Sequence, residues 1–196
     1  MTDHQPALTL ASTSPYRKAL LERLGLSFET IRPEVDETPE KHESAEALVA
    51  RLSELKARAG ANSHSESWVI GSDQVAVCKQ QILGKPGNNE NAIRQLKSLS
   101  GNRVTFLTGL CLHNAAAGIS HSTLVPFSVV FRELTNEEIE RYLLADEPYN
   151  CAGSFKSEGL GISLFERMEG EDPSALMGLP LIQLVTWLRL EGFTIP

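Results

Sequence analysis

The sequence has few cysteines and lacks the motifs of several common enzyme classes. Its three cysteines, Cys78, Cys111 and Cys151, lie far apart and form no CxxC pair. This number and spacing argue against a disulfide framework or a zinc site, and we expect reduced thiols in a cytosolic protein. No Walker A loop, HExxH or GxSxG sequence occurs, which excludes the common P-loop, zincin and α/β-hydrolase classes.

The sequence also lacks a long apolar run and an excess of basic residues. No apolar run reaches membrane-spanning length, and the N-terminal MTDHQPALTL has no basic region followed by an apolar one. Lys and Arg total 18 against 25 Asp and Glu, so the net charge is −7. We therefore expect a cytoplasmic protein with no nucleic-acid or membrane partner. The acidic balance is still compatible with a small polyanionic substrate if positive charge is concentrated in one cleft.

What the sequence does have is an ordinary globular composition, with 41% hydrophobic residues in a chain of 196. We expect strands at 8–11, 27–32, 68–77, 104–112 and 119–131. We expect helices from Ser14-Pro15 to Gly25, from about Ser44, near 89–98, from Thr135 to about Ala145, and over 176–190. In the first of these Ser14 is the expected N-cap and Pro15 the first helical residue, and in the fourth Thr135 and Glu138 form a capping box. Because strands and helices mix throughout, the predicted fold class is α/β.

Three local features qualify this pattern. Gly71 and Asp73 interrupt the strand predicted over 68–77, and Pro126 places the strand over 119–131 at a sheet edge. The segment 151–167 is rich in Gly and Ser, and we expect it to be irregular.

The segment Ser12–Arg17 joins a predicted strand to a predicted helix. A helix N-terminus offers unpaired N–H groups and a positive dipole end, which suit a phosphate. Ser12 and Ser14 add hydroxyl groups, and Arg17 adds a charged fork for phosphate oxygens. An ordinary helix cap beside a surface Arg explains this segment equally well.

Carboxylates supply the second group of candidates. Asp73 lies inside an otherwise apolar strand, where a charge is costly unless it is paired or coordinated. It could hold a metal or accept a proton from water, or simply bind backbone N–H groups at a strand end. The acidic segment Glu34–Glu37 could bind Mg²⁺ or Mn²⁺ through oxygen ligands, although such clusters are more often solvated loops.

The remaining candidates are polar residues on a helix and in two loops. Lys56 follows the apolar stripe of its predicted helix, and Lys85 lies in a Gly-Lys-Pro turn. The segment 154–159 is polar and flanked by glycines. Lys56 and Lys85 each have an alternative explanation as an ordinary solvated lysine.

Together these segments resemble the Maf family of nucleotide pyrophosphatases, in particular the subfamily that acts on 7-methyl-GTP. The matching pieces follow the family's order over nearly the whole chain. They are LASTSPYR, EVDET, LSELKA, IGSDQV, LGKP, SGNRVTFLTGL and CAGSFKSEGLGISLFE. The resemblance implies one Maf domain over residues 1–196, with a mixed β-sheet, flanking helices and two lobes around a central cleft, as in the related ITPase-like fold.

The resemblance also implies roles for individual residues. Asp73 matches the family's catalytic base, and Glu37 matches an acidic position associated with metal binding. We expect Asp73 and Glu37 to bind a divalent cation, Mg²⁺ or Mn²⁺. The positions that match polar, phosphate-facing residues of the family are Ser12, Ser14, Arg17, Lys56 and Lys85.

Three further positions bear on the base. Family members that act on dTTP and UTP typically carry Arg, Thr and Gln where this chain has Tyr16, Gln74 and Glu158. The Glu158 carboxylate could accept hydrogen bonds from the N1–H and N2–H edge of guanine. The Tyr16 ring could stack on the cationic 7-methylguanine, an interaction of roughly 0.5–2 kcal/mol. Trp is frequent at position 16 in this subfamily, so Tyr16 is a small departure.

These residues predict hydrolysis of 7-methyl-GTP to 7-methyl-GMP and pyrophosphate by a cytoplasmic enzyme that could form a homodimer. One alternative is a Maf-type pyrophosphatase for another base, such as GTP, UTP or CTP. Another is a non-catalytic nucleotide-binding regulator of cell division. Retention of Asp73, Lys56, Lys85 and Glu37 together favours catalysis, because a pure binder needs no carboxylate to activate water. RNA binding is disfavoured by the acidic balance.

Overall fold

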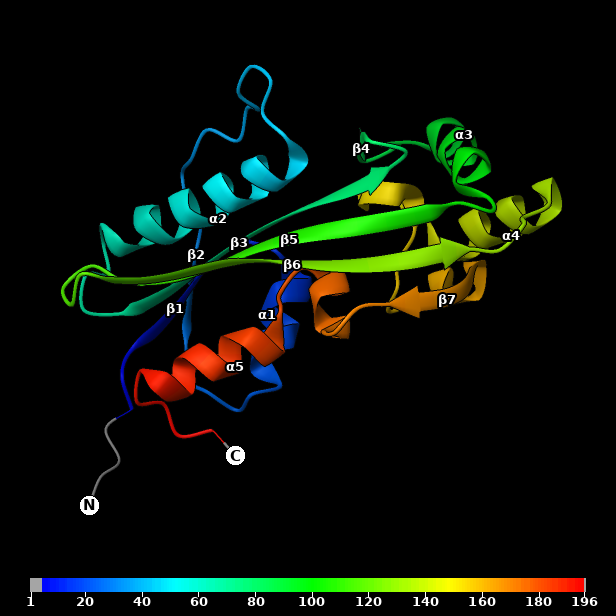
Figure 1. Cartoon of the computed structure of the whole chain (residues 1–196). Coiled ribbons are helices and arrows are strands. Elements are labelled where there is room, and N and C mark those ends of the chain that lie inside the picture. Colours follow the sequence, from blue (N-terminus) through cyan, green and yellow to red (C-terminus); the bar gives the residue numbers. More distant parts are fainter. Residues whose placement is uncertain (1–4, 196) are drawn as a thin grey trace. The chain divides into compact units, whose positions relative to one another are not determined.

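The computed structural model describes residues 5–195 and has a mixed α/β fold (Figure 1). Its strands are β1 (Leu8–Ala11), β2 (Glu29–Ile31), β3 (Trp68–Cys78), β4 (Gln81–Leu83), β5 (Arg103–Asn114), β6 (Ile119–Phe131) and β7 (Phe165–Glu169). Its α-helices are α1 (Pro15–Glu22), α2 (Ala45–Ala61), α3 (Asn89–Leu99), α4 (Asn136–Asp146) and α5 (Leu181–Leu190). Three short 3₁₀ helices are η1 (Ala152–Ser154), η2 (Leu160–Leu164) and η3 (Pro173–Met177). The predicted α/β class is confirmed.

The strands form one sheet in the order β2-β1-β3-β5-β6-β7, and β4 pairs with β3 outside this path. β1 runs parallel to β2 and to β3, whereas β4 is antiparallel to β3 and β7 is antiparallel to β6. Within residues 5–195, no helix is both long enough and apolar enough to cross a lipid bilayer. The first four residues of the N-terminal segment considered above lie outside the described part of the chain.

The chain divides into two compact units. Unit 1 comprises Met1–Gln74, Thr108–Val125 and Asp172–Pro196, and unit 2 comprises Val75–Leu107 and Pro126–Glu171. The expectation of a single domain over residues 1–196 stays a prediction.

Strands β1 and β3 bury both of their faces within unit 1. Leu8 and Leu10 of β1 and Ile70 of β3 belong to a core cluster with residues of α1 and α5, including Leu20 and Leu184. Successive side chains of a strand point to opposite faces. Accordingly, Ala11 of β1 and Val69 of β3 pack instead against Ala61 of α2. Helices α1 and α5 therefore cover one face of these strands, and α2 covers the other.

Helix α2 lies unusually close to the strands because glycines face it. A Cβ built on Gly71 of β3 would lie 2.1 Å from the carbonyl oxygen of Ser53, and one on Gly109 of β5 would lie 2.3 Å from that of Val49. The expectation that Gly71 and Asp73 interrupt the strand is wrong, since β3 runs unbroken through both. Gly71 instead allows α2 to approach β3.

Unit 2 has an aromatic core. The ring of Phe155 packs edge-to-face against Phe106, Phe131 and Phe165, with centroid separations of 5.4, 5.5 and 5.0 Å. Such edge-to-face pairs add to the stability gained from burial alone. Phe165 opens β7, so the prediction of irregular structure over 151–167 is wrong at its end, where β7 pairs with β6.

The start of the last helix and the position of β6 in the sheet also differ from expectation. The last helix begins at Leu181 and not at 176, because Gly178 has a left-handed φ of +95° and the N-cap residue is Pro180. Strand β6 is not an edge strand over its second half, since Ser128 to Phe131 pair with β7. Pro126 precedes that ladder, so its missing N–H is tolerated there.

Candidate active site

The segment between β1 and α1 in unit 1 is organised by its hydroxyl groups and Arg17. Ser14 is the N-cap of α1, and its side chain accepts a hydrogen bond from the Arg17 N–H. The buried Ser12 Oγ accepts from the Ser14 N–H at 3.2 Å and from Arg17 Nη1 at 3.5 Å. The predicted Ser cap with Pro at the first helical position is confirmed.

Lys56, Asp73 and Glu37 meet in one cluster, although they come from α2, β3 and the loop before α2. Lys56 Nζ lies 2.6 Å from Asp73 Oδ1 and 2.8 Å from Glu37 Oε1. The side chains of Lys56 and Asp73 are 8% and 12% exposed, whereas that of Glu37 is 60% exposed. A charged pair this buried is tolerated because each partner neutralises the other.

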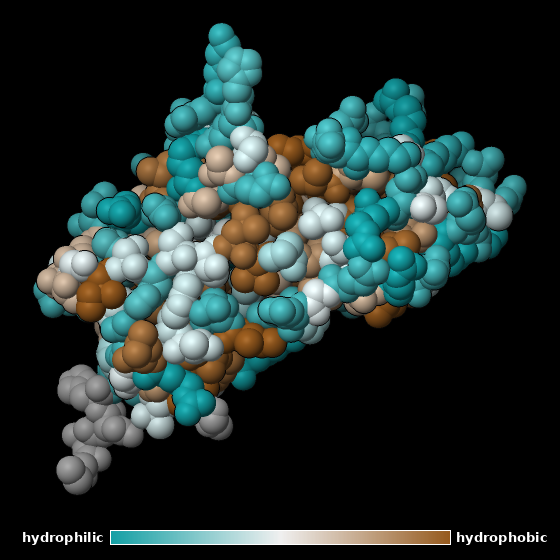
Figure 2. All heavy atoms as spheres, in the orientation of Figure 1, coloured by the Kyte–Doolittle hydropathy of each residue, from teal (hydrophilic) through white to brown (hydrophobic). Residues whose placement is uncertain are grey.

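The loop that carries Glu37 is anchored to α2. Arg51 of α2 donates to both carboxylate oxygens of Glu43, at 2.6 and 2.8 Å, and to the Thr38 carbonyl at 3.2 Å. The hydrogen bond from Arg51 lowers the pKa of Glu43 to about 2. Figure 2 shows a hydrophilic surface over this segment between β2 and α2. Glu37 therefore reaches Lys56 from an exposed but tethered loop.

Arg17 shares the electrostatic environment of this cluster. Burial lowers the pKa of its guanidinium, and the negative charges of Asp73 and Glu37 act in the opposite direction. Two cations, Arg17 and Lys56, thus face two carboxylates within unit 1. Residues from the segment before α1, the loop before α2 and strand β3 are brought together there.

A turn at residues 175–178 supports the cluster, and sequence reasoning missed it. The Gly178 carbonyl accepts from Arg17 Nε at 2.8 Å and from Ser72 Oγ at 2.9 Å. Asp172 stabilises the turn, because its carboxylate accepts from the N–H groups of Ser174 and Ile182. The only signal in the sequence was Gly178-Leu-Pro ahead of the last helix, which indicates a turn but not its partners.

Of the three residues predicted to select the base, Gln74 lies beside this turn. Its amide nitrogen donates to the Ala175 carbonyl at 2.7 Å, to the Leu176 carbonyl at 3.3 Å and to Thr108 Oγ1 at 2.8 Å. Gln74 thereby ties β3 to η3. The Tyr16 side chain in the first turn of α1 is 42% exposed.

Lys85 and Glu158 belong to unit 2, and both are exposed. Gln95 of α3 connects their segments, since it donates to the Gly84 carbonyl at 3.1 Å and accepts a hydrogen bond from Ser154 Oγ. Glu158 accepts from Ser157 Oγ at 3.2 Å. The turn before α3 and the segment around η1 are therefore held together within this unit.

The donor set of the cluster fits a hard divalent cation. Among the described residues, no group of three or more His, Cys, Asp or Glu side chains is placed to hold a metal. Glu37 and Asp73 nevertheless bring two carboxylates to the same ammonium group. Mg²⁺ commonly takes one or two carboxylates and completes its shell with water and substrate phosphates. Glu37 and Asp73 would hold Mg²⁺ or Mn²⁺ in that way.

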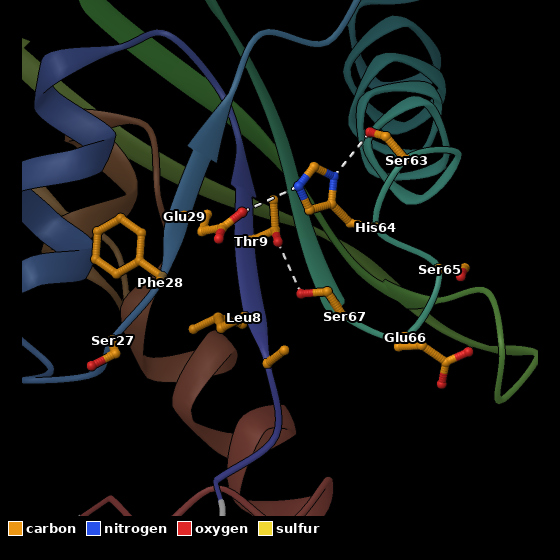
Figure 3. Close-up of a pocket in the computed structure, with 11 residues that line it drawn as sticks. Leu8, Thr9, Ser27, Phe28, Glu29, Ser63, His64, Ser65, Glu66 and Ser67 are labelled. Atoms are coloured by element: carbon orange, nitrogen blue, oxygen red, sulfur yellow. Dashed lines mark hydrogen bonds and ion pairs between the residues drawn. The ribbon is translucent and has the colours of Figure 1, made fainter.

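A pocket of about 530 Å³ also opens in unit 1, where β1 and β3 begin (Figure 3). It is lined by residues 7–9, 27–29 and 63–67. His64 lies between Glu29 and Ser63, and Thr9 and Ser67 point toward each other with their oxygens 2.9 Å apart. No Lys or Arg is among these lining residues, so this pocket does not suit a triphosphate.

Comparison with known proteins identifies the family. The profile described as Maf-like protein matches residues 7–191. The chain belongs to the Maf family. The match spans β1 through α5 and includes every residue of the cluster, so the resemblance noted in the short motifs extends over the fold.

Three relatives that match nearly the whole chain have the same name. A protein of Alcanivorax borkumensis is 54% identical over 196 residues, all of both chains. A protein of Nitrosococcus oceani is 53% identical over 97% of this chain and 96% of its own. A protein of Pseudoalteromonas translucida is 55% identical over 96% of this chain and 93% of its own. All three are named 7-methyl-GTP pyrophosphatase.

A solved structure supports the fold alone. The Staphylococcus aureus Ham1 protein matches 94% of this chain and 99% of its own, with a TM-score of 0.53 and 14% sequence identity. The expected Maf/ITPase-like architecture therefore has a structural counterpart. The roles of the individual site residues stay predictions.

Proposed function

We propose that this Maf chain is a hydrolase that converts 7-methyl-GTP to 7-methyl-GMP and pyrophosphate. The observation that carries the proposal is the cluster of Asp73, Glu37, Lys56 and Arg17 beside the N-terminus of α1. The shared name of relatives more than 50% identical over the full chain supports the choice of substrate.

In the proposed reaction, water attacks the α-phosphorus, and Asp73 accepts the proton that water loses. The bond between the α-phosphorus and the oxygen that bridges to the β-phosphorus breaks, and its electrons leave with pyrophosphate. In the free protein Asp73 Oδ1 is bound to Lys56, and in the proposed reaction the Asp73 carboxylate accepts the proton once the nucleotide is bound. A positioned carboxylate of this kind contributes about 10²–10⁴-fold to a rate.

The phosphates require positive charge and N–H donors. We assign this role to Ser12, Ser14, Arg17 and the first turn of α1, and to Lys56 and Lys85. A bound Mg²⁺ or Mn²⁺ ion, held by Glu37 and Asp73, would neutralise phosphate charge as the leaving group departs. Lys85 is assigned on its Gly-Lys-Pro sequence alone.

Base selection rests on Tyr16, Gln74 and Glu158. The exposed Tyr16 ring suits stacking on a cationic purine, and the Glu158 carboxylate suits the N1–H and N2–H edge. Because Gln74 donates its amide protons to the turn at 175–176, its carbonyl oxygen is the group we assign to the substrate. A preference for GTP, UTP or CTP is the alternative that the experiment below distinguishes.

The proposal places the reaction in the cytoplasm and needs a nucleotide as its only partner. The net charge of −7 argues against nucleic-acid and membrane partners, since those surfaces attract basic proteins. A homodimer stays a prediction, which analytical ultracentrifugation would check.

The test is pyrophosphate release from a panel of 7-methyl-GTP, GTP, CTP, UTP and dTTP, with ion-exchange chromatography of the products. We expect the highest kcat/KM with 7-methyl-GTP, and monophosphate plus pyrophosphate as products. Protein carrying Asp73→Asn, purified identically, corrects for contaminating phosphatases. Release of orthophosphate with a diphosphate would exclude the mechanism, and a preference for UTP or dTTP would exclude the substrate.

A further inference from the structure

The Lys56 ammonium group bridges the two carboxylates of the cluster. Its ammonium group lies 2.6 Å from Asp73 Oδ1 and 2.8 Å from Glu37 Oε1. These are the two carboxylates that the proposed function assigns to Mg²⁺ or Mn²⁺. Like charges so close together repel strongly in a partly buried site, so the ammonium and the divalent ion exclude each other there.

The charges of the cluster are already balanced by the chain. Lys56 and Arg17 supply two positive charges, and Asp73 and Glu37 supply two negative charges. A divalent ion that entered alone would leave this group with two excess positive charges in a place with little solvent. Nucleotide phosphates would cancel that excess and give the displaced ammonium a new partner.

We propose that Lys56 is an internal counter-ion that holds the divalent site closed until the nucleotide arrives. In the free protein Lys56 bridges Glu37 and Asp73, and divalent ions bind weakly. When nucleotide and metal enter together, the Lys56 ammonium turns from the carboxylates to the phosphates. This role explains why Lys56 pairs with two carboxylates in the structure. It also explains why Lys56 matches a phosphate-facing position of the family.

The surroundings of Lys56 allow this exchange. Glu37 lies on a loop with 60% of its side chain exposed, so it can follow an incoming cation. Asp73 is fixed within β3. The aliphatic stem of Lys56 is buried on α2, which leaves only the end of the side chain to move. The loop stays anchored through Arg51 and Glu43.

The test is titration of the nucleotide-free protein with Mn²⁺, followed by electron paramagnetic resonance of the free ion. We expect millimolar binding by the wild type. Lys56→Met, which keeps the length of the stem and removes the charge, should bind one Mn²⁺ per chain at least about tenfold more tightly. The control is Lys18→Met, because Lys18 is exposed and pairs with Glu22 in α1; it should leave the affinity unchanged.

A double variant locates the effect. Lys56→Met combined with Asp73→Asn should lose the gain in Mn²⁺ affinity, whereas a retained gain would place the ion elsewhere and overturn the proposal. Equal affinities of wild type and Lys56→Met would also overturn it, as would low-micromolar binding of Mn²⁺ by the wild type. If Lys56→Met does not fold, Lys56→Gln replaces it, because the amide still donates to Asp73.

This experiment is independent of the proposed reaction. No nucleotide is present, so failure of the counter-ion proposal leaves the assignment of 7-methyl-GTP untouched. Conversely, absence of pyrophosphate release from the nucleotide panel would not change the Mn²⁺ affinities.

Discussion

Arg17 donates a hydrogen bond from Nε to the carbonyl oxygen of Gly178, at 2.8 Å, across 161 positions of sequence. The same carbonyl accepts from Ser72 Oγ. The guanidinium is thereby oriented through Nε, while its Nη1 reaches Ser12. The orientation of Arg17, which we assign to the phosphates, thus depends on the turn at residues 175–178.

Substitution of Gly178 by Ala should weaken both stability and phosphate binding. Gly178 has a φ of +95°, and an added Cβ would lie 3.2 Å from Arg17 Nε. We expect a loss of about 1–3 kcal/mol from backbone strain and, with Arg17 displaced, a roughly tenfold or greater rise in KM. Thermal unfolding and steady-state kinetics measure the two effects.

Gly118→Ala is the matched control for this prediction. Gly118 also has a positive φ, of +67°, but nothing lies within 4 Å of the place that an added Cβ would take. The Gly118→Ala variant should lose about as much free energy of unfolding as Gly178→Ala and keep the wild-type KM. A normal KM for Gly178→Ala would show that the turn does not position Arg17.

Replacement of Asp73 by Asn should remove most of the turnover and keep the fold. The amide is nearly isosteric and can still accept from Lys56, but it cannot accept a proton from water. We expect kcat to fall by about 10²–10⁴-fold. Kinetics should be read beside circular dichroism and the melting temperature. Substantial turnover in a folded variant would remove Asp73 from the role of general base.

Removal of divalent cations should abolish activity, and added Mg²⁺ or Mn²⁺ should restore it. The reason is that Glu37 and Asp73 supply oxygen ligands beside a highly charged substrate. Glu37→Gln should raise the Mg²⁺ concentration needed for half-maximal rate. Glu46→Gln, an exposed change in the first turn of α2, should not. Full activity after exhaustive chelation would contradict the proposed metal requirement.

Glu158→Gln should lower kcat/KM for 7-methyl-GTP far more than for UTP. Methylation at N7 places positive charge on the purine, so loss of a charged hydrogen bond costs about 1.5–3 kcal/mol, or roughly ten- to hundredfold. Tyr16→Arg should shift preference away from the methylated purine, because the guanidinium repels it. Glu166→Gln, an exposed change in β7, is the control. An equal loss for every base would refute this assignment.

The sequence by itself determined the features that depend on neighbouring residues. Ser14 caps α1 as expected, α2 begins beside Ser44 as expected, and Thr135 with Glu138 forms the predicted capping box. These contacts join residues three apart, so the order of residue types is enough to specify them. The α/β class and the chemical types of the candidate site residues could also be predicted, because they too depend on the local order of residue types.

Only the tertiary structure decided which of those residues meet. Lys56 reaches Asp73 because Gly71 and Gly109 let α2 lie close to β3 and β5. The sequence pattern suggested instead that Gly71 broke the strand. Likewise, Lys56 was expected to face phosphate, and its pairing with both carboxylates came from packing. Contacts between distant segments follow from strand register and helix packing, and residue spacing along the chain carries no direct record of either.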